Sequence, residues 1–425
     1  MSAESTSLLA PERILGTISG RVSGLAMGLW VVAILIGGAG VVTSIDSMPV
    51  RTWQAIWVNF LYWTAIAQAG VGFGAVLVTA RGHWGKPFIR VAEATGAFLP
   101  VSLLVFAAMY FGAEHIFPWM EEGFSGHLNR EWVNHRDVFV RNGILLALLY
   151  GVSFAFMRLS LRPDAKLIAE HHSGWRAKVM GMCTRGWRGD DEELARSRRT
   201  ANWLAPVLIG LWALVFSFMS FDLTMSLMRN FVSVIWGGLY LFAGWLCMLS
   251  LVAILAHRYR VRHNLDDVWT KWEFHDLGKL MFAFTIFWAY IWFSQFLPIW
   301  YGNLGRETIF FEQRTAGGFG TLLWLQMALV FMIPFALLLW RRPKMNPRWL
   351  AFVGLILLCG FWLERYMLVV PSTWHGEGIP FGWPEIAITI GFVGLFGLCY
   401  SIFASLTPRL PIREPLISGK RSRGP

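Results

Sequence analysis

Ten stretches of the sequence are each long and apolar enough to cross a lipid bilayer, and this feature limits the fold more than any other. A spanning helix needs about 20 predominantly apolar residues, because the hydrocarbon layer is roughly 30 Å thick. Only helices and closed barrels satisfy their backbone hydrogen bonds in lipid, and continuous apolar runs without alternation indicate helices. The sequence therefore predicts an all-α integral membrane protein with spans at residues 22–45, 53–80, 90–112, 139–161, 202–227, 232–257, 276–300, 317–340, 348–371 and 384–406.

The composition agrees with a polytopic membrane protein and excludes a soluble, disordered or disulfide-rich chain. Of the 425 residues, 56% are hydrophobic and 15% are charged, whereas soluble domains carry about a quarter charged residues. The net charge of +11 comes from lysines and arginines that lie between the spans, so we expect no nucleic-acid partner. The cysteines form no Cys-x-x-Cys pair and the histidines lie in links or at span ends, so no metal ligand, haem or iron–sulfur site is predicted.

The distribution of basic residues predicts the orientation of the chain. Ten lysines and arginines lie in segment 158–200, and further basic residues follow spans eight and ten, whereas link 113–138 carries acidic ones. Basic links remain on the cytoplasmic side, so both termini are expected there. We divide the chain into a cytoplasmic N-terminal segment (1–21), a transmembrane domain (22–406) and a cytoplasmic tail (407–425). Link 162–200 is polar enough for a short amphipathic helix.

Polar and ionisable residues within the spans are candidate functional residues, because lipid makes them costly. Carboxylates and amides together are the groups that a water-filled proton path requires. By depth, the candidates form an inner group of Glu93, His275, Asp276 and Lys279 and an outer group of Asn59, Asp222, Gln295, Glu364 and Arg365. Two structural alternatives remain open: the inner residues are anchors that reach the interface, and Arg365 is the counter-ion of a carboxylate on a neighbouring helix.

Two motifs that contain several of these residues are similar to a known family. The first reads FDLTMSL at 221–227 and GGLYLFAG at 237–244; the second reads DLGKLMFAF at 276–284, FWAYI at 287–291, FSQ at 293–295 and IWYGN at 299–303. Both resemble the ActF family, membrane subunits of alternative complex III, a bacterial quinol:electron acceptor oxidoreductase. The segments 228–232 (MRNFV) and 304–307 (LGRE) depart from the family pattern.

The resemblance implies an NrfD/PsrC-like fold, with ten transmembrane helices in two four-helix bundles plus two peripheral helices. It implies an ActC-like NrfD-family companion that carries most of the quinol oxidation, a periplasmic iron–sulfur subunit and haem c subunits, in the bacterial inner (cytoplasmic) membrane. This chain would be a non-catalytic subunit that scaffolds the complex and conducts protons through polar half-channels. It would bind no cofactor except quinone, quinol or lipid.

Two other functions remain open from the sequence. The chain could be a quinone-binding subunit in the strict sense, with a site among aromatic and polar residues in the outer leaflet. It could also be a secondary transporter, which requires broken helices that face each other at the midplane. The prolines of the spans, Pro206 and Pro334 among them, lie at span edges or singly and give no such pair.

Overall fold

The computed structural model describes residues 11–18, 22–120, 132–171, 173–228 and 231–412. Within this part of the chain all regular structure is helical, and ten helices are long and apolar enough to cross a membrane. Seven of them are single helices: α2 (Gly24–Ser44), α3 (Pro49–Thr79), α6 (His135–His171), α9 (Trp236–His263), α10 (Lys271–Gly302), α15 (Pro347–Thr373) and α16 (Trp383–Leu406). The third spanning helix consists of η2 (His83–Phe88), α4 (Ile89–Glu93), η3 (Ala94–Phe98), α5 (Leu99–Met109) and η4 (Tyr110–His115). The fifth consists of α8 (Asp190–Leu223) and η6 (Met225–Leu227), and the eighth of α12 (Phe319–Met327), η7 (Ala328–Met332) and α13 (Ile333–Leu338).

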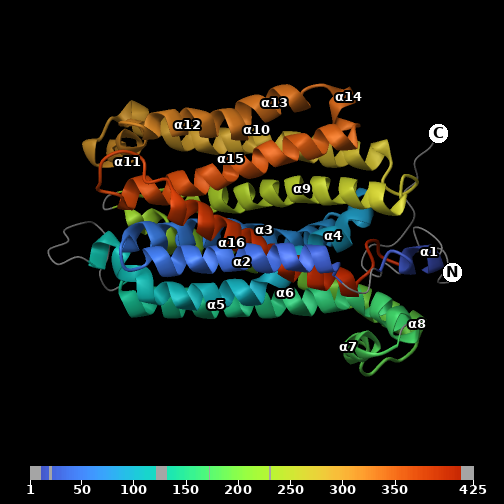
Figure 1. Cartoon of the computed structure of the whole chain (residues 1–425). Coiled ribbons are helices and arrows are strands. Elements are labelled where there is room, and N and C mark those ends of the chain that lie inside the picture. Colours follow the sequence, from blue (N-terminus) through green and yellow to red (C-terminus); the bar gives the residue numbers. More distant parts are fainter. Residues whose placement is uncertain (1–10, 19–21, 121–131, 172, 229–230, 413–425) are drawn as a thin grey trace.

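The long helices lie side by side, and the short helices lie at their two ends (Figure 1). The short ones are α1 (Pro11–Leu15), η5 (Pro118–Met120), α7 (Trp175–Cys183), α11 (Gly305–Thr315) and α14 (Arg341–Lys344). Figure 1 places α1, α7 and α14 at one end, which we call the α7 end, and α11 at the opposite end, which we call the α11 end.

The ten predicted spans are confirmed as helices, but their bounds differ where helices continue beyond the apolar stretch. The fourth helix extends to His171 and the fifth begins at Asp190, well outside the predicted bounds 139–161 and 202–227. The reason is that hydropathy measures the apolar part of a helix, whereas these continuations are polar. The short helix expected in link 162–200 is α7, while α11 was not predicted.

Some sequence-based expectations concern residues outside the described part of the chain. They include most of the N-terminal segment and of the tail, at 1–10, 19–21 and 413–425, and the acidic Glu121, Glu122 and Glu131. The departure from the family pattern at Arg229 and Asn230 also lies there.

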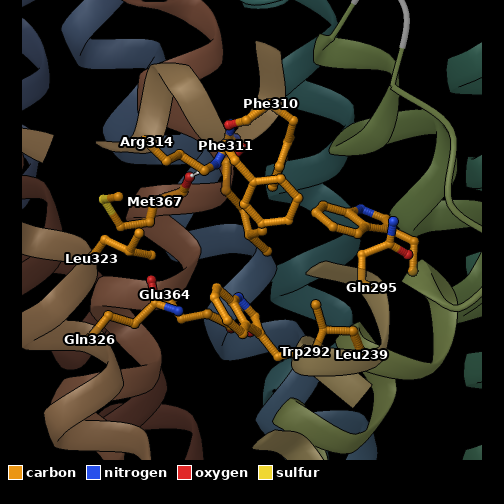
Figure 2. Close-up of a pocket in the computed structure, with 12 residues that line it drawn as sticks. Leu239, Trp292, Gln295, Phe310, Phe311, Arg314, Leu323, Gln326, Glu364 and Met367 are labelled. Carbon is orange, nitrogen blue, oxygen red and sulfur yellow. Dashed lines mark hydrogen bonds between the residues drawn. The ribbon is translucent and has the colours of Figure 1, made fainter. Parts of the chain in front are cut away.

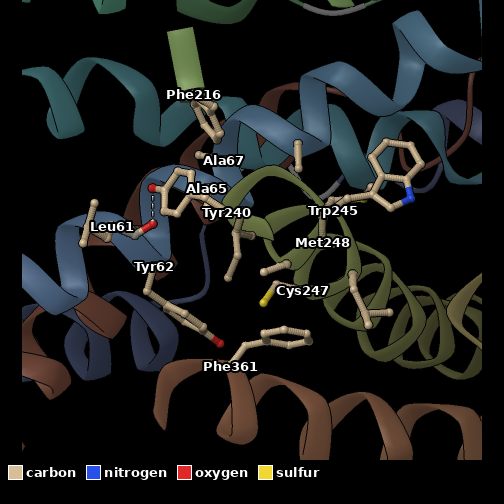
Figure 3. Close-up of a cluster of buried hydrophobic side chains, with 14 of the residues drawn as sticks. Leu61, Tyr62, Ala65, Ala67, Phe216, Tyr240, Trp245, Cys247, Met248 and Phe361 are labelled. Atoms are coloured by element: carbon tan, nitrogen blue, oxygen red, sulfur yellow. Dashed lines mark hydrogen bonds between the residues drawn. The ribbon is translucent and has the colours of Figure 1, made fainter. Parts of the chain in front are cut away.

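Helix α3 is the centre of the molecule. The most apolar window of α3 is 89% buried, compared with 11% for α2. Its small residues allow close approach by neighbours: a Cβ at Gly72 would lie 2.5 Å from the Trp212 ring, and one at Gly70 would lie 2.3 Å from the Ala92 carbonyl. Figure 3 shows the buried cluster between α3, α9 and α15, where the Tyr240 hydroxyl donates to the Leu61 carbonyl oxygen at 2.8 Å.

Helices α2 and α16 pack along each other through small residues. A Cβ at Gly37 would lie 2.4 Å from the Gly391 Cα, and one at Gly40 would lie 2.6 Å from the Ala387 Cβ. Elsewhere on α2, Leu25, Leu29 and Leu35 are exposed. This arrangement is typical of helix pairs in lipid, where small residues bring backbones together and apolar side chains face outward.

Replacing Gly391 with valine is expected to separate α2 from α16 and to lower the free energy of unfolding by about 1–3 kcal/mol, the usual cost of overpacking. The matched control is Gly38→Val on the same pair of helices, because a Cβ at Gly38 meets no atom within 4 Å. Thermal unfolding in detergent measures both variants. Equal stability of Gly391→Val and Gly38→Val would contradict the close contact.

Candidate functional site

A small, mostly apolar cavity with four polar or charged lining residues lies inside the protein toward the α11 end (Figure 2). It encloses about 30 Å³, and a buried water needs roughly 10–15 Å³, so it has room for one or two waters. Four of its lining residues are polar or charged, and the others are apolar or aromatic. We call it the Glu364 cavity; it is lined by Trp236, Leu239, Trp292, Gln295, Phe310, Phe311, Arg314, Leu323, Gln326, Glu364, Met367 and Leu368.

Glu364 on α15 is the only carboxylate among the described residues that line this cavity, and it is 2% exposed. Its Oε1 accepts a hydrogen bond from Trp288 Nε1 at 3.1 Å. Its Oε2 lies 3.1 Å from Nη1 of Arg365. Two opposite charges that are both buried attract strongly, because little water screens them.

Arg365 therefore pairs with its own neighbour in sequence, and among the described residues it forms no ion pair with a carboxylate on another helix. Adjacent residues leave a helix in different directions, but the long arginine side chain still brings its guanidinium to within 3.1 Å of Glu364. The guanidinium also lies 4.3 Å from the centre of the Tyr240 ring, and Nη2 donates to the Tyr240 carbonyl oxygen at 3.3 Å. These contacts hold the Glu364–Arg365 pair of α15 against α9.

Arg314 closes the cavity from α11, and its position follows from a proline in α15. Pro371 has no N–H, so the Met367 carbonyl lacks its usual helical partner. Arg314 Nε donates to that oxygen at 2.9 Å, and its Nη2 donates to the Leu368 carbonyl and the Ser372 hydroxyl at 3.1 and 2.8 Å. Burial lowers the pKa of Arg314 to about 9, so the side chain still carries its charge at neutral pH.

Two glutamines add neutral polar groups to the cavity wall. Gln295 on α10 accepts a hydrogen bond from the Ser233 hydroxyl. Gln326 on α12 is 3% exposed, and its amide makes no hydrogen bond within the described residues. A buried amide without a protein partner is a natural site for an ordered water. The cavity thus combines a carboxylate, an arginine and two amides around space for water.

Asp222 lies elsewhere, at the α11 end of α8, where donors surround its carboxylate. Oδ2 accepts from Arg141 Nη2 at 2.7 Å and from Asn142 Nδ2 at 2.6 Å, and Oδ1 accepts from Trp132 Nε1 at 3.3 Å. The Arg141 guanidinium also lies 4.0 Å from the centre of the Trp132 ring. A carboxylate at a helix C-terminus is disfavoured by the helix dipole, so these partners offset an otherwise unfavourable position.

Replacing Asp222 with asparagine is expected to lower the free energy of unfolding by about 1–3 kcal/mol, because Arg141 loses its carboxylate while Asn142 loses a charged acceptor. Asp46→Asn is the matched control, since Asp46 is exposed. Thermal unfolding of the two purified variants checks the expectation. A midpoint for Asp222→Asn equal to that of the control would show that the cluster contributes no stability.

Glu93 belongs to a buried cluster near the α7 end. Arg90 Nη1 donates to Glu93 Oε2 at 2.5 Å, and its Nε and Nη2 donate to Asp164 Oδ2 at 3.0 and 2.8 Å. The Ser160 hydroxyl lies 2.5 Å from Arg90 Nη1. Because the Glu93 side chain is fully buried, it is not an anchor that reaches the interface. Its Oε1 has no hydrogen-bond partner within the described residues.

The other inner candidates lie on α10 and take different partners. Lys279 Nζ lies 2.9 Å from Asp276 Oδ1, and the lysine side chain is 56% exposed. The His275 ring makes an edge contact with Trp272. The residues that were predicted to form one inner group therefore belong to two separate clusters. One is buried around Arg90, and the other is half-exposed on the first turns of α10. The anchor interpretation fits Lys279.

Asn59 on α3 links two neighbouring helices. Its Nδ2 donates to Thr389 Oγ1 on α16 at 2.9 Å, and its Oδ1 accepts from Trp362 Nε1 on α15 at 3.3 Å. Of the predicted outer group, the structure brings Glu364, Arg365 and Gln295 close together, but it gives Asn59 and Asp222 other partners.

Sequence reasoning missed four charged residues that shape these sites. Arg90 and Arg141 hold the carboxylates of Glu93 and Asp222, Asp164 is a second carboxylate bound by Arg90, and Arg314 binds backbone carbonyls of α15. Each lies near a predicted span end or in a link, where a charge usually indicates an interfacial anchor. One signal was available for Arg314, because Pro371 inside an apolar span leaves a carbonyl without its helical donor. Comparisons of the sequence with protein-family models and with curated proteins found no match.

Proposed function

We propose that this chain is a membrane subunit of a quinol:electron acceptor oxidoreductase of the alternative complex III type, which scaffolds the complex and conducts protons. The observation that carries the proposal is Glu364: a titratable carboxylate, buried within a spanning helix, beside a cavity that is large enough for water and that an arginine and two glutamines also line. An ionisable residue at such a depth indicates function, because lipid makes it costly.

The contacts between helices support the layout of two four-helix bundles. The second to fifth spanning helices pack on one another, with α3 against α8 and α6 against both α5 and α8. Among the sixth to ninth spanning helices, α9 packs on α10 and α15, and α15 packs on α12. Helices α2 and α16 pair with each other and lie against α3 through α16, which is consistent with two peripheral helices.

Polar side chains along α6 and its neighbours suggest where protons would cross the first bundle. Between the Asp222 and Glu93 clusters, the Tyr150 hydroxyl lies 2.8 Å from that of Ser102, and Gln68 Nε2 donates to Ser153 Oγ at 3.0 Å. By the helix rise, each of these pairs lies about 10–12 Å from the nearer cluster, so waters must complete the path. In the second bundle, the Glu364 cavity supplies the half of the path at the α11 end.

The partners follow from the same proposal. An ActC-like membrane subunit, a periplasmic iron–sulfur subunit and haem c subunits carry the electrons, in the bacterial inner membrane, and membrane lipids surround the spans. Both termini are then cytoplasmic, and the α11 end faces the periplasm. The basic residues at the α7 end, including Arg341 and Arg342 of α14, support this orientation.

Deletion of the gene tests the proposal. Membranes from the deletion strain should lose quinol-dependent reduction of the acceptor, and the full chain supplied in trans should restore it. If the activity of the membranes is unchanged, the chain is not a subunit of the oxidoreductase.

A specific observation favours quinone binding as a second function. An apolar groove of about 650 Å³ lies between α10 and α12, and Trp292 and Leu323 line both this groove and the Glu364 cavity. A long isoprenoid tail fits such a groove, and the polar groups of the Glu364 cavity lie on the other side of Trp292 and Leu323. A photoaffinity quinone should then label the groove; labelling confined to the companion subunit would exclude the site. The groove is lined by Ile286, Ala289, Tyr290, Trp292, Phe293, Phe296, Thr315, Leu323, Trp324, Met327, Phe331 and Met332.

A further inference from the structure

A strongly basic pocket of about 500 Å³ lies at the α7 end, between α6, α8 and the segment that precedes α8. Five of the described residues that line it are arginines and one is a carboxylate. We call it the arginine pocket: Arg158, Arg162, Arg185, Arg188 and Arg196, with Glu193 and the apolar Ala155, Leu159 and Leu204.

The pocket has an apolar side and a cationic side. Ala155 and Leu159 of α6 and Leu204 of α8 belong to the ends of the two apolar stretches, where the helices leave the predicted membrane layer. Arg158 and Arg196 lie at the edge of the same pocket, and both are exposed. This combination suits a ligand with an apolar chain and an anionic head, because basic pockets between spanning helices bind lipid headgroups.

A buried ion pair holds the pocket in shape. Arg162 is 8% exposed and Glu193 is 1% exposed, and Arg162 Nε lies 2.8 Å from Glu193 Oε2. Arg162 Nη2 also donates to the carbonyl oxygens of Arg185 and Gly186, each at 3.2 Å. The turn before α8 is thereby fixed against α6, and Arg185 is placed at the edge of the pocket.

Within the described part of the chain, most of the arginines at the edge of the pocket have no carboxylate partner. Arg158, Arg185 and Arg196 are exposed and form no ion pair within the described residues. Arg188 lies 3.4 Å from Glu192, but both side chains are largely exposed, so this pair neutralises little of the field. An anion placed among these guanidinium groups would accept several charge-assisted hydrogen bonds.

We propose that the arginine pocket binds the headgroup phosphate of an anionic phospholipid, whose acyl chains lie along Ala155, Leu159 and Leu204. A free phosphate offers the same anionic oxygens, but it leaves the apolar side of the pocket without an occupant. The proposal does not depend on the function of the chain, because it rests only on this pocket and its position at the end of two spanning helices.

Native mass spectrometry of the purified full chain, titrated with phosphatidylglycerol, tests the proposal. The pocket variant is Arg158→Gln with Arg196→Gln, and the matched control is Arg199→Gln with Arg342→Gln, two exposed arginines outside the pocket. The pocket variant should bind phosphatidylglycerol roughly tenfold more weakly, because each arginine near an anionic lipid contributes about a fivefold factor or less. The control should bind like the unaltered chain. Equal binding by pocket and control variants would overturn the proposal.

Two further titrations use the unaltered chain, so they do not depend on the folding of any variant. Zwitterionic phosphatidylcholine should bind more weakly than phosphatidylglycerol, and added salt should weaken phosphatidylglycerol binding. Inorganic phosphate should not displace the lipid at equal concentration. Displacement by phosphate would indicate a site for a soluble anion, and equal binding of the two lipids would indicate a simple apolar surface; either result would refute the proposal.

Discussion

Replacing Arg90 with methionine is expected to lower the free energy of unfolding by about 3–5 kcal/mol, the largest stability effect of any single substitution we consider. Arg90 contacts two carboxylates, Glu93 and Asp164, and none of the three side chains is more than 1% exposed. Methionine keeps the length and the helix propensity of the residue, but it leaves two buried negative charges without their shared cation. Unfolding of the purified chain by heat or by a denaturing detergent, followed by tryptophan fluorescence, measures the loss.

Neutralising the carboxylates gives the test of mechanism. Arg90→Met combined with Glu93→Gln and Asp164→Asn removes all three charges, so it should recover most of the stability that Arg90→Met loses. Arg199→Met, at an exposed position of α8, is the control for the loss of an arginine. A loss for Arg90→Met within about 1 kcal/mol of this control would contradict a buried charged cluster.

The second large effect is expected on proton movement. Under the proposed function, Glu364→Gln should slow the proton transfer coupled to quinol oxidation on the order of 100-fold, because a neutral amide cannot take up and release a proton in place of a carboxylate. The cavity has no other carboxylate among its described lining residues, and Arg314 keeps its proton at neutral pH. Electron transfer from quinol to acceptor should remain, because we place the redox centres in other chains.

Proteoliposomes that contain the assembled complex provide the measurement: protons moved for each electron transferred. Glu377→Gln, an exposed residue in the link before α16, is the matched control. Glu364→Gln also leaves Arg365 without its carboxylate, so the double variant Glu364→Gln, Arg365→Met separates a loss of protons from a loss of folding. An unchanged proton-to-electron ratio in a folded Glu364→Gln complex would exclude Glu364 from the path.

The positions of the spans could be predicted from the sequence because they depend on local hydropathy alone. Every spanning helix contains one long apolar window, and this local property requires no knowledge of neighbours. The continuation of α6 to His171 and the start of α8 at Asp190 could not be found in this way, since both helices continue as polar segments outside the apolar layer.

The candidate site was predicted only in part, because partners in space are not neighbours in sequence. The depth of Glu364 and Gln295 in their spans was enough to place both in one group, and both line the cavity. Depth could not show that Asp222 is held by Arg141, which precedes it by 81 residues, or that Arg90 joins Glu93 to Asp164. Such pairs depend on how helices face one another, and a single sequence does not contain that information.

We propose that this chain is a subunit of a complex whose electrons travel through other subunits. The most direct test is to purify the tagged full chain from its own membranes in mild detergent, separate the subunits, and record where the haem absorption and the iron–sulfur paramagnetic signal elute. We expect both signals to purify with the chain at first and then to elute with its partners. A chain that elutes without redox partners from the start, or that keeps a redox centre of its own after separation, would contradict the proposal.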